Sequence, residues 1–279
     1  MNESLSKTAD AAIFAPIAPG VIGPALTLAK RELVRFLRQR NRVASALLQP
    51  IVIFVLFGSA LNGSFKAPAG ADTHYFEYLF PGTIAMILMF TAIFSTISII
   101  EDRREGFLQS VLVAPAPRLS MVLGKLLGGT ALAFFQALIF LIAGYFFIMT
   151  KMTPMDLLLS CGMMALIAFA LCGLGFFIAW RMDSTQGFHA IMMLFLMPML
   201  MLSGAFFPAQ GAPAWLSWTM HANPLYYGLA ALRHTIYGAN PPWQLPNFEL
   251  SLGITIAFAV ATVGASVAIS GTRTTGDLQ

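Results

Sequence analysis

The chain has 279 residues, of which 58% are apolar and only 10% carry a charge, against about 25% charged residues in a typical soluble domain. This composition excludes an ordinary water-soluble fold. The formal net charge of +4 is too small an excess over so apolar a chain to indicate a nucleic-acid partner. Cys161 and Cys172 lie in one apolar run without companions at metal-ligand spacing, so neither a disulfide nor a metal site is expected.

Six apolar stretches are long enough to cross a bilayer, which takes about 20 residues of helix. Each is almost uniformly apolar, and backbone groups in hydrocarbon must pair within their own segment, so helices are favoured over barrel strands. Pro50 and Pro198 lie inside two stretches and predict kinks. The sequence therefore predicts an all-α polytopic membrane protein with six transmembrane helices, at residues 43–61, 79–100, 126–149, 155–180, 188–207 and 248–269.

Lysine and arginine are unevenly distributed between the two sides of this topology. Thirteen of the 16 precede the first span or follow the second, fourth or sixth, whereas Lys66, Lys151 and Arg233 lie on the other side. Cytoplasmic loops hold the positive excess, so both termini are expected in the cytoplasm. The expected organisation is a flexible cytoplasmic tail at 1–23, an amphipathic helix at 24–42, the six-span domain at 43–269 and a second tail at 270–279.

The predicted helix at 24–42 is basic on one face. Pro24 suits its first turn, and Arg31, Arg35, Arg38 and Arg42 recur at intervals of four, three and four residues. Leucine and phenylalanine side chains lie broadly opposite. Periodicity alone favours a lipid anchor in the inner membrane interface, and a docking surface for a partner protein is the alternative.

A second patterned segment follows the second span. A mixed-charge cluster that includes Glu101, Arg104 and Glu105 precedes an apolar stripe, which stops at a proline-rich turn. An ordinary solvated connector has no need of such a stripe, so a short amphipathic helix that docks a partner in the cytoplasm is favoured. The stripe consists of Phe107, Leu108, Val111 and Leu112.

Small and polar residues mark the interior of the predicted spans. Thr91, Ser95 and Ser98 repeat at helical spacing and form a polar stripe. Gly124 and Gly128 permit close helix contact, within one chain or between two. The methionines of the fifth span either line an adaptable substrate path or, more commonly, fill the core and face lipid.

No ionisable residue lies at the middle of a predicted span, which disfavours an ion-coupled carrier. His189, Lys125 and Glu249 lie near span ends, where snorkelling to the interface is the simpler interpretation. The sequence holds no catalytic set, metal-ligand cluster or G-x-x-x-x-G-K-[ST] phosphate loop. The chain is therefore not expected to be an enzyme, and if ATP drives it, another subunit must bind the ATP.

About 40 residues, 208–247, connect the fifth and sixth spans and are rich in aromatic side chains. They predict short interfacial or re-entrant helices that lie in or dip into the outer leaflet. Such helices would form an interfacial cap or, in a sharper hypothesis, an extracellular gate.

Two motifs carry a family likeness. One runs from Glu105-Gly106-x-Leu108 through Pro115, Pro117-Arg118 and Gly124-Lys125, and the other from Ser203-Gly204-x-Phe206-Phe207-Pro208 through Pro213-x-Trp215-Leu216 and Asn223-Pro224-Leu225 to Arg233. With these motifs the chain resembles, over about residues 24–269, the membrane subunits of ATP-binding-cassette transporters of the ABC-2 exporter type. Phe107 and Ala114 depart from the family pattern, which often has threonine at both positions.

The resemblance implies a permease of the bacterial inner membrane that pairs with a second permease, usually an identical one, and with two ATPase subunits. ATP and Mg²⁺ would bind those subunits, and this chain itself would bind no cofactor. The helix at 24–42 would be the connecting helix, 101–117 the coupling element, and 208–236 the outer re-entrant helices. The residues expected to contact the ATPase are Arg31, Arg35, Arg38, Glu101, Arg104, Glu105, Gly106, Leu108, Pro115 and Arg118.

The function that the resemblance implies is export of an amphipathic drug, a lipid or a lipid-linked saccharide. A non-transporting membrane anchor and, less favoured, a secondary carrier are the alternatives. The substrate path is expected at Thr91, Ser95, Ser98, Met197 and Met201, and the outer gate at Phe207, Pro208, Trp215, Asn223, Pro224 and Tyr227.

Overall fold

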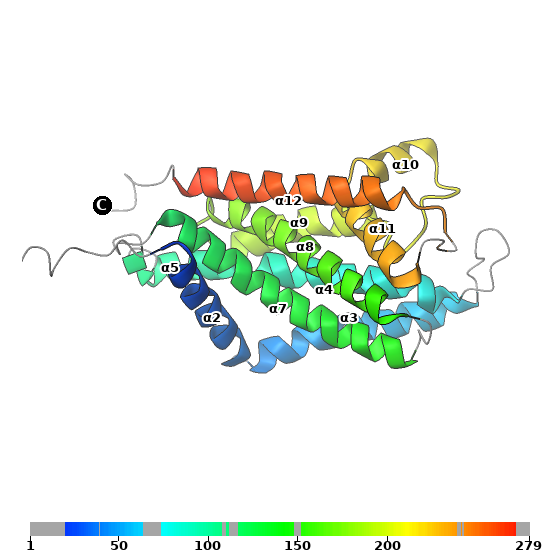
Figure 1. Ribbon diagram of the computed structural model, residues 1–279, viewed down its shortest axis with the longest axis horizontal. Helices are drawn as coiled ribbons and strands as arrows, with labels where there is room; N and C mark the ends of the chain where they lie inside the picture. The colour runs from blue at the N-terminus through cyan, green and yellow to red at the C-terminus, as the bar shows by residue number, and fades with distance from the viewer. Residues whose placement is uncertain are drawn as a thin grey trace, which may run out of the picture.

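The computed structural model describes residues 20–38, 40–63, 74–107, 110–111, 117–147, 152–238, 241 and 243–271. Every regular element in these ranges is a helix, which confirms the predicted all-α class (Figure 1). The helices are α2 (Ile22–Arg38), α3 (Arg40–Asn62), α4 (Tyr75–Ser95), α5 (Ile97–Arg104), α7 (Arg118–Phe147), α8 (Pro154–Ala179), α9 (Thr185–Met201), α10 (Ala214–His221), α11 (Pro224–Tyr237) and α12 (Phe248–Ser270).

Four segments are long and apolar enough to cross a membrane: Tyr75–Arg104, Arg118–Phe146, Pro154–Ala179 and Phe248–Ser270. The first joins α4 and α5 across a single turn residue, Thr96. Two further apolar helices, Leu48–Asn62 and Thr185–Met201, are shorter. The structure thus supplies four candidate spans, where the sequence predicts six.

The fifth predicted span extends beyond the C-terminal end of the helix that the structure contains. The stretch 188–207 was expected to be helical throughout, whereas α9 ends at Met201. Pro198 lies in its last turn, and Gly204 adopts a φ of +78°, a left-handed conformation that suits glycine and ends helices. The chain turns there toward α10 and α11.

The helices form an elongated bundle around α4 (Figure 1). Within their most apolar windows, 78% of residues are buried for the α4–α5 segment but only 28% for α12. α4 packs against α3, α7, α8 and α11, whereas α12 packs chiefly on α8 and α11. The exposed sides of α3, α9 and α12 carry large apolar residues, as lipid-facing helices do.

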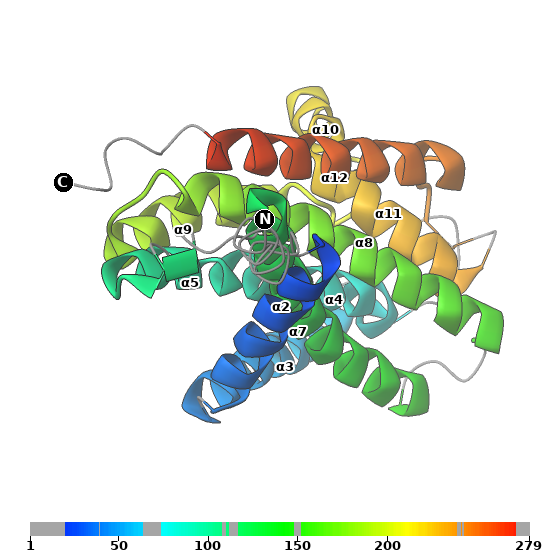
Figure 2. The ribbon, with the colours of Figure 1, turned by 60° about the vertical axis from the view of Figure 1, so that its left-hand side comes forward.

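α2 crosses α7 at the two glycines that the sequence analysis singled out (Figure 2). A Cβ on Gly124 would lie 2.6 Å from the Leu28 Cβ, and one on Gly128 would lie 2.8 Å from the Glu32 Cβ. The glycines therefore serve a contact within one chain. α2 is assigned to Arg38 and α3 from Arg40, so Arg42 belongs to α3 and the predicted segment 24–42 is shared between two helices.

Candidate functional site at the α5 end

Asp102 is the centre of an ion network at the end of the bundle that holds α2, α5 and the start of α7, called here the α5 end. Its carboxylate is fully buried and accepts two hydrogen bonds from Arg31, from Nη1 at 3.1 Å and from Nη2 at 3.0 Å. Arg35 donates from Nη1 at 2.9 Å to the same carboxylate. Planar guanidinium groups suit such bidentate contacts. α2 is thus fastened to α5 by charge.

Lys125 joins this network from α7. Its ammonium donates to the Glu32 carboxylate at 2.7 Å, to Ser98 Oγ at 3.1 Å and to Asp102. The residue is only 5% exposed. The interpretation that Lys125 snorkels to the interface is therefore wrong, because two carboxylates within the bundle satisfy its charge.

The charges of this ion network nearly balance. The cations are Arg31, Arg35 and Lys125; the anions are Asp102 and Glu32, with Glu101 bonded to Arg35 at 2.9 Å. Burial lowers the pKa of the Arg31 guanidinium, but its hydrogen bonds and attraction to Asp102 raise that pKa by more, so Arg31 stays charged. Compensation of this kind is required, because an unpaired buried charge is strongly destabilising.

Two arginines on the opposite face of α5 form hydrogen bonds with the turn between α8 and α9. Arg103 donates from Nη2 to the Trp180 carbonyl at 2.8 Å and from Nη1 to the Met182 carbonyl at 3.0 Å. It also pairs with the exposed carboxylate of Asp183, and Arg104 donates to the Asp183 carbonyl at 3.0 Å. One short helix thus links α2, α7 and the α8–α9 turn.

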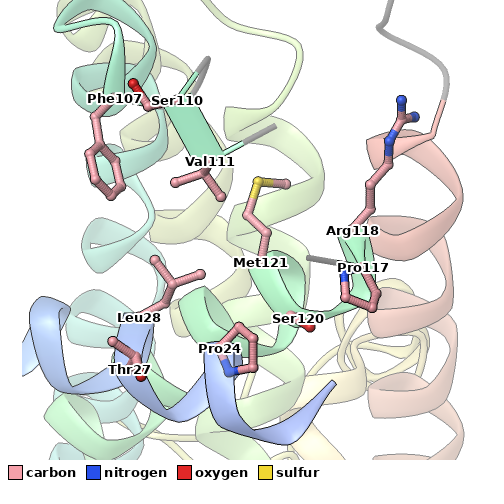
Figure 3. A pocket seen from close by; sticks show the side chains of 10 residues that line it. All are labelled: Pro24, Thr27, Leu28, Phe107, Ser110, Val111, Pro117, Arg118, Ser120 and Met121. Atoms are coloured by element: carbon pink, nitrogen blue, oxygen red, sulfur yellow. The ribbon is translucent and has the colours of Figure 1, made fainter. Parts of the chain in front are cut away.

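A groove of about 420 Å³ opens beside the network, between α2, the segment after α5 and the start of α7. Figure 3 shows Leu28, Val111 and Met121 pointing into it from these three segments. Phe107 also lines the groove, and the Arg31 guanidinium lies 3.6 Å from its ring centroid. The wall of the groove is mainly apolar. Two members of the predicted apolar stripe, Phe107 and Val111, thus line the same cavity.

Three of the remaining predicted ATPase-contact residues, Glu105, Gly106 and Arg118, lie at this site. Glu105 pairs with Arg35 at 3.5 Å, and Gly106 ends α5 with a φ of +75°. Arg118 lines the groove and donates to the Gly271 carbonyl at 3.1 Å, while Arg38 is exposed at the end of α2. Leu108 and Pro115 lie outside the described residues.

The predicted substrate-path residues do not gather at one place. Thr91 and Ser95 line a cavity of about 200 Å³ between α3, α4 and α9, and Thr91 donates to Gln136 at 2.6 Å. Ser98 instead belongs to the ion network. Met197 and Met201 lie partly exposed on α9, away from this cavity.

The predicted outer-gate residues lie at the opposite end, called here the α11 end. Asn223 caps α11 by accepting from the Leu225 N–H at 3.0 Å, with Pro224 as the first helical residue, and donates to the Met199 carbonyl at 2.6 Å. Tyr227 lines a cavity of about 500 Å³ with a mixed polar and apolar wall. Phe207 and Trp215 are exposed, and Pro208 is half-buried.

Arg233, which ends the second sequence motif, makes contacts at the α11 end that the sequence did not predict. It is 2% exposed and donates to the Gly204 carbonyl at 2.9 Å and to the Tyr78 carbonyl at 3.3 Å. Its guanidinium lies over the Tyr78 ring, 4.2 Å from the centroid. The available signal was its isolation, because no other lysine or arginine occurs between Arg181 and Arg273.

A model of the family described as ABC-2 type transporter matches residues 25–237, which include most of α2, the ion network and α11. The chain belongs to this family. ABC-2 permeases usually work with ATPase subunits, so a transport subunit is indicated rather than a catalytic one.

Named relatives of this ABC-2 chain are permeases too. It is 25% identical over 228 residues to "Putative transport permease ycf38" of Cyanophora paradoxa, covering 80% of this chain and 78% of that one. It is 28% identical over 152 residues to "Probable multidrug ABC transporter permease YbhR" of Escherichia coli K12, covering 54% and 41%. It is 23% identical over 238 residues to "Inner membrane transport permease YadH" of the same organism, covering 83% and 88%.

Proposed function

We propose that this chain is the permease subunit of an ABC-2 exporter and works as a homodimer with two ATPase subunits. The observation that carries the proposal is the position of α5. Its acidic residues hold α2 and α7, while Arg103 and Arg104 hold the α8–α9 turn. A displacement applied to α5 would therefore reach four helices at once.

The groove beside the ion network is the proposed binding site for the ATPase. It combines an apolar wall with exposed charges at its edge, which is the usual layout of a protein interface. ATP and Mg²⁺ would bind the ATPase, since this sequence has no phosphate loop. Closure of two ATPases on ATP would then push on α5 and move the spans.

The proposed substrate path uses the cavity between α3, α4 and α9. Phe90, Phe94 and Met193 give it apolar walls, and Thr91 and His189 add polar atoms. Such a lining suits an amphipathic substrate such as a drug, a lipid or a lipid-linked saccharide, and one relative is named as a multidrug permease. Export, rather than import, follows the exporter likeness of the two sequence motifs.

In the proposed topology, α3 and α9 complete six spans in a bacterial inner membrane, with the α5 end and both termini in the cytoplasm. The 13 basic residues expected on that side support it. Cysteines introduced at the exposed positions Ser110 and Gln244, in a chain with Cys161 and Cys172 replaced by alanine, test it. An impermeant thiol reagent should label only Gln244→Cys in intact cells, and labelling of Ser110→Cys would reverse the orientation.

Affinity purification tests the coupling proposal. The tagged chain, extracted from its own membranes, should carry along a protein with a G-x-x-x-x-G-K-[ST] loop, and the intact assembly should weigh two permeases plus two ATPases. Val111→Asp places a charge in the apolar groove and should abolish this co-purification at normal membrane abundance. Gln244→Asp adds the same charge at the α11 end and should leave it unchanged.

Two outcomes would remove the coupling proposal. One is a wild-type chain that purifies without any ATPase, which would favour a membrane anchor. The other is a Val111→Asp chain that retains its ATPase at the wild-type level, which would place the interface elsewhere.

A further inference from the structure

Two tryptophans on α10 point away from the protein. Trp215 is 69% exposed and Trp218 is 80% exposed, and their spacing of three residues places them on one face of the helix. On the opposite side, Met220 is fully buried. The chain therefore presents two of its largest side chains on one helix face without covering them.

The surroundings of this tryptophan face are uncharged. Residues 204–232 contain no aspartate, glutamate, lysine or arginine. A surface loop in water, or a protein interface steered by charge, normally carries such residues. An uncharged segment with exposed tryptophans matches the boundary between lipid and water instead, where tryptophan is enriched.

The position of α10 agrees with this boundary. Figures 1 and 2 both show α10 projecting from the bundle beyond α12, and in Figure 1 it lies near the orange Phe248 end of that helix. α12 carries exposed apolar residues along its length, Leu250 and Val260 among them, so the apolar surface of a candidate span continues toward α10. Ser217 and His221, on another side of α10, line the cavity of about 500 Å³, whose wall is both polar and apolar. α10 therefore exposes two indoles on one side and carries polar side chains on another.

We propose that α10 is a lipid-binding helix: Trp215 and Trp218 insert among phospholipid headgroups and upper acyl chains, at the membrane surface of the α11 end. An indole ring has a large apolar body and one N–H donor, which fits a zone that is part apolar and part wet. The assignment gives Trp215 a lipid contact in place of the gate role expected from the sequence. It does not depend on the transported substrate or on the ATPase.

Tryptophan fluorescence tests the proposal directly, because the chain has only four tryptophans and the other two are buried: Trp180 is 1% exposed and Trp243 is 3% exposed. The full chain would be reconstituted in vesicles of dioleoylphosphatidylcholine or of its brominated analogue, in which bromine quenches indoles that contact lipid. The matched control is Trp215→Phe/Trp218→Phe, which keeps both buried tryptophans and an apolar α10.

Brominated lipid should remove about half of the wild-type emission, since two of four tryptophans would contact lipid, and should hardly affect the double variant. Bromine nearer the headgroup should quench more than bromine near the chain ends. Quenching by aqueous iodide with no response to brominated lipid would overturn the proposal, because the pair would then face water. So would protection from both quenchers, because another protein surface or a second copy would then cover the pair.

Discussion

The two ends of the bundle hold their helices together by different chemistry. At the α5 end, Arg31, Arg35 and Lys125 meet carboxylates. At the α11 end, the buried guanidinium of Arg233 meets carbonyl oxygens and aromatic rings, and within the described residues no carboxylate pairs with it. At the α5 end each buried cation needs a carboxylate to compensate its charge. At the α11 end the single cation Arg233 depends instead on how carbonyl oxygens and aromatic rings are placed around it.

The difference matters for movement. Arg35 has contacts with Glu101, Asp102 and Glu105, so it can exchange partners when α2 and α5 shift relative to each other. Arg233 is enclosed and has no acidic partner among the described residues. A small shift of α2 against α5 would therefore leave Arg35 paired, whereas a shift around Arg233 would break its contacts.

Removal of the central carboxylate should have the largest effect. Asp102→Asn leaves three cations around a neutral amide, and loss of one partner from a buried charge cluster costs roughly 3–5 kcal/mol. Thermal unfolding of the purified chain in detergent measures this. Asp183→Asn breaks a pair whose carboxylate is 81% exposed, and it should change stability little. Equal effects of the two substitutions would show that Asp102 is not the centre of the network.

Arg233→Gln should come second. It removes two charge-assisted hydrogen bonds and the contact with the Tyr78 ring, but leaves no like charges facing each other, so the expected loss is about 2 kcal/mol. The control is Arg181→Gln, the same substitution at an exposed arginine that lies over the Phe177 ring. If both variants unfold at the wild-type temperature, the contacts of Arg233 do not stabilise the α11 end.

The α2–α7 crossing should respond less. Gly124→Ala brings a Cβ to 2.6 Å from the Leu28 Cβ and 2.9 Å from the Ala25 carbonyl oxygen, so α2 must shift, at a cost of about 1–3 kcal/mol. Gly264→Ala, on α12 with nothing within 4 Å, should be neutral or slightly stabilising because alanine favours helix. Co-purification of an ATPase should weaken only for Gly124→Ala, and the reverse order of effects would contradict this contact.

The smallest effects should come from single hydroxyl groups, one at each end. Tyr78→Phe removes a 2.6 Å hydrogen bond to the Gly204 carbonyl, and Ser98→Ala removes a 3.1 Å hydrogen bond from Lys125. Each should cost about 1 kcal/mol, measured by the same thermal unfolding. Ser98→Ala should be the milder of the two, because Lys125 keeps two carboxylates. Among the described residues, only Arg233 would still donate to the Gly204 carbonyl in Tyr78→Phe.

Most of the helices follow from apolar length. The stretch 248–269 was predicted and α12 is Phe248–Ser270; the stretch 155–180 was predicted and α8 is Pro154–Ala179. The bounds of such helices can be predicted from the sequence because their apolar composition changes sharply at both ends. The end of α9 was missed, since a helix end at Met201 depends on a glycine turn inside an apolar run.

The site was predictable only in part. Charge patterning indicated Arg31, Arg35 and Glu101 separately, but not that they meet, nor that Glu32, Asp102 and Lys125 join them. Lys125 and Glu32 are 93 residues apart, and their contact exists only because α2 folds back across the glycines of α7. The contacts of Arg233 were missed for the same reason, since its partners lie 29 and 155 residues away in sequence.

The polar stripe on α4 and α5 also restricts how that span can move. Thr91 is bonded to Gln136 of α7, and Ser98, two helical turns further along, is bonded to Lys125 of the same helix. Two ties about 10 Å apart along one axis resist rotation of the span about that axis and any slide along its neighbour. A force on α5 would then leave one motion open, in which the two helices lean together as a single lever.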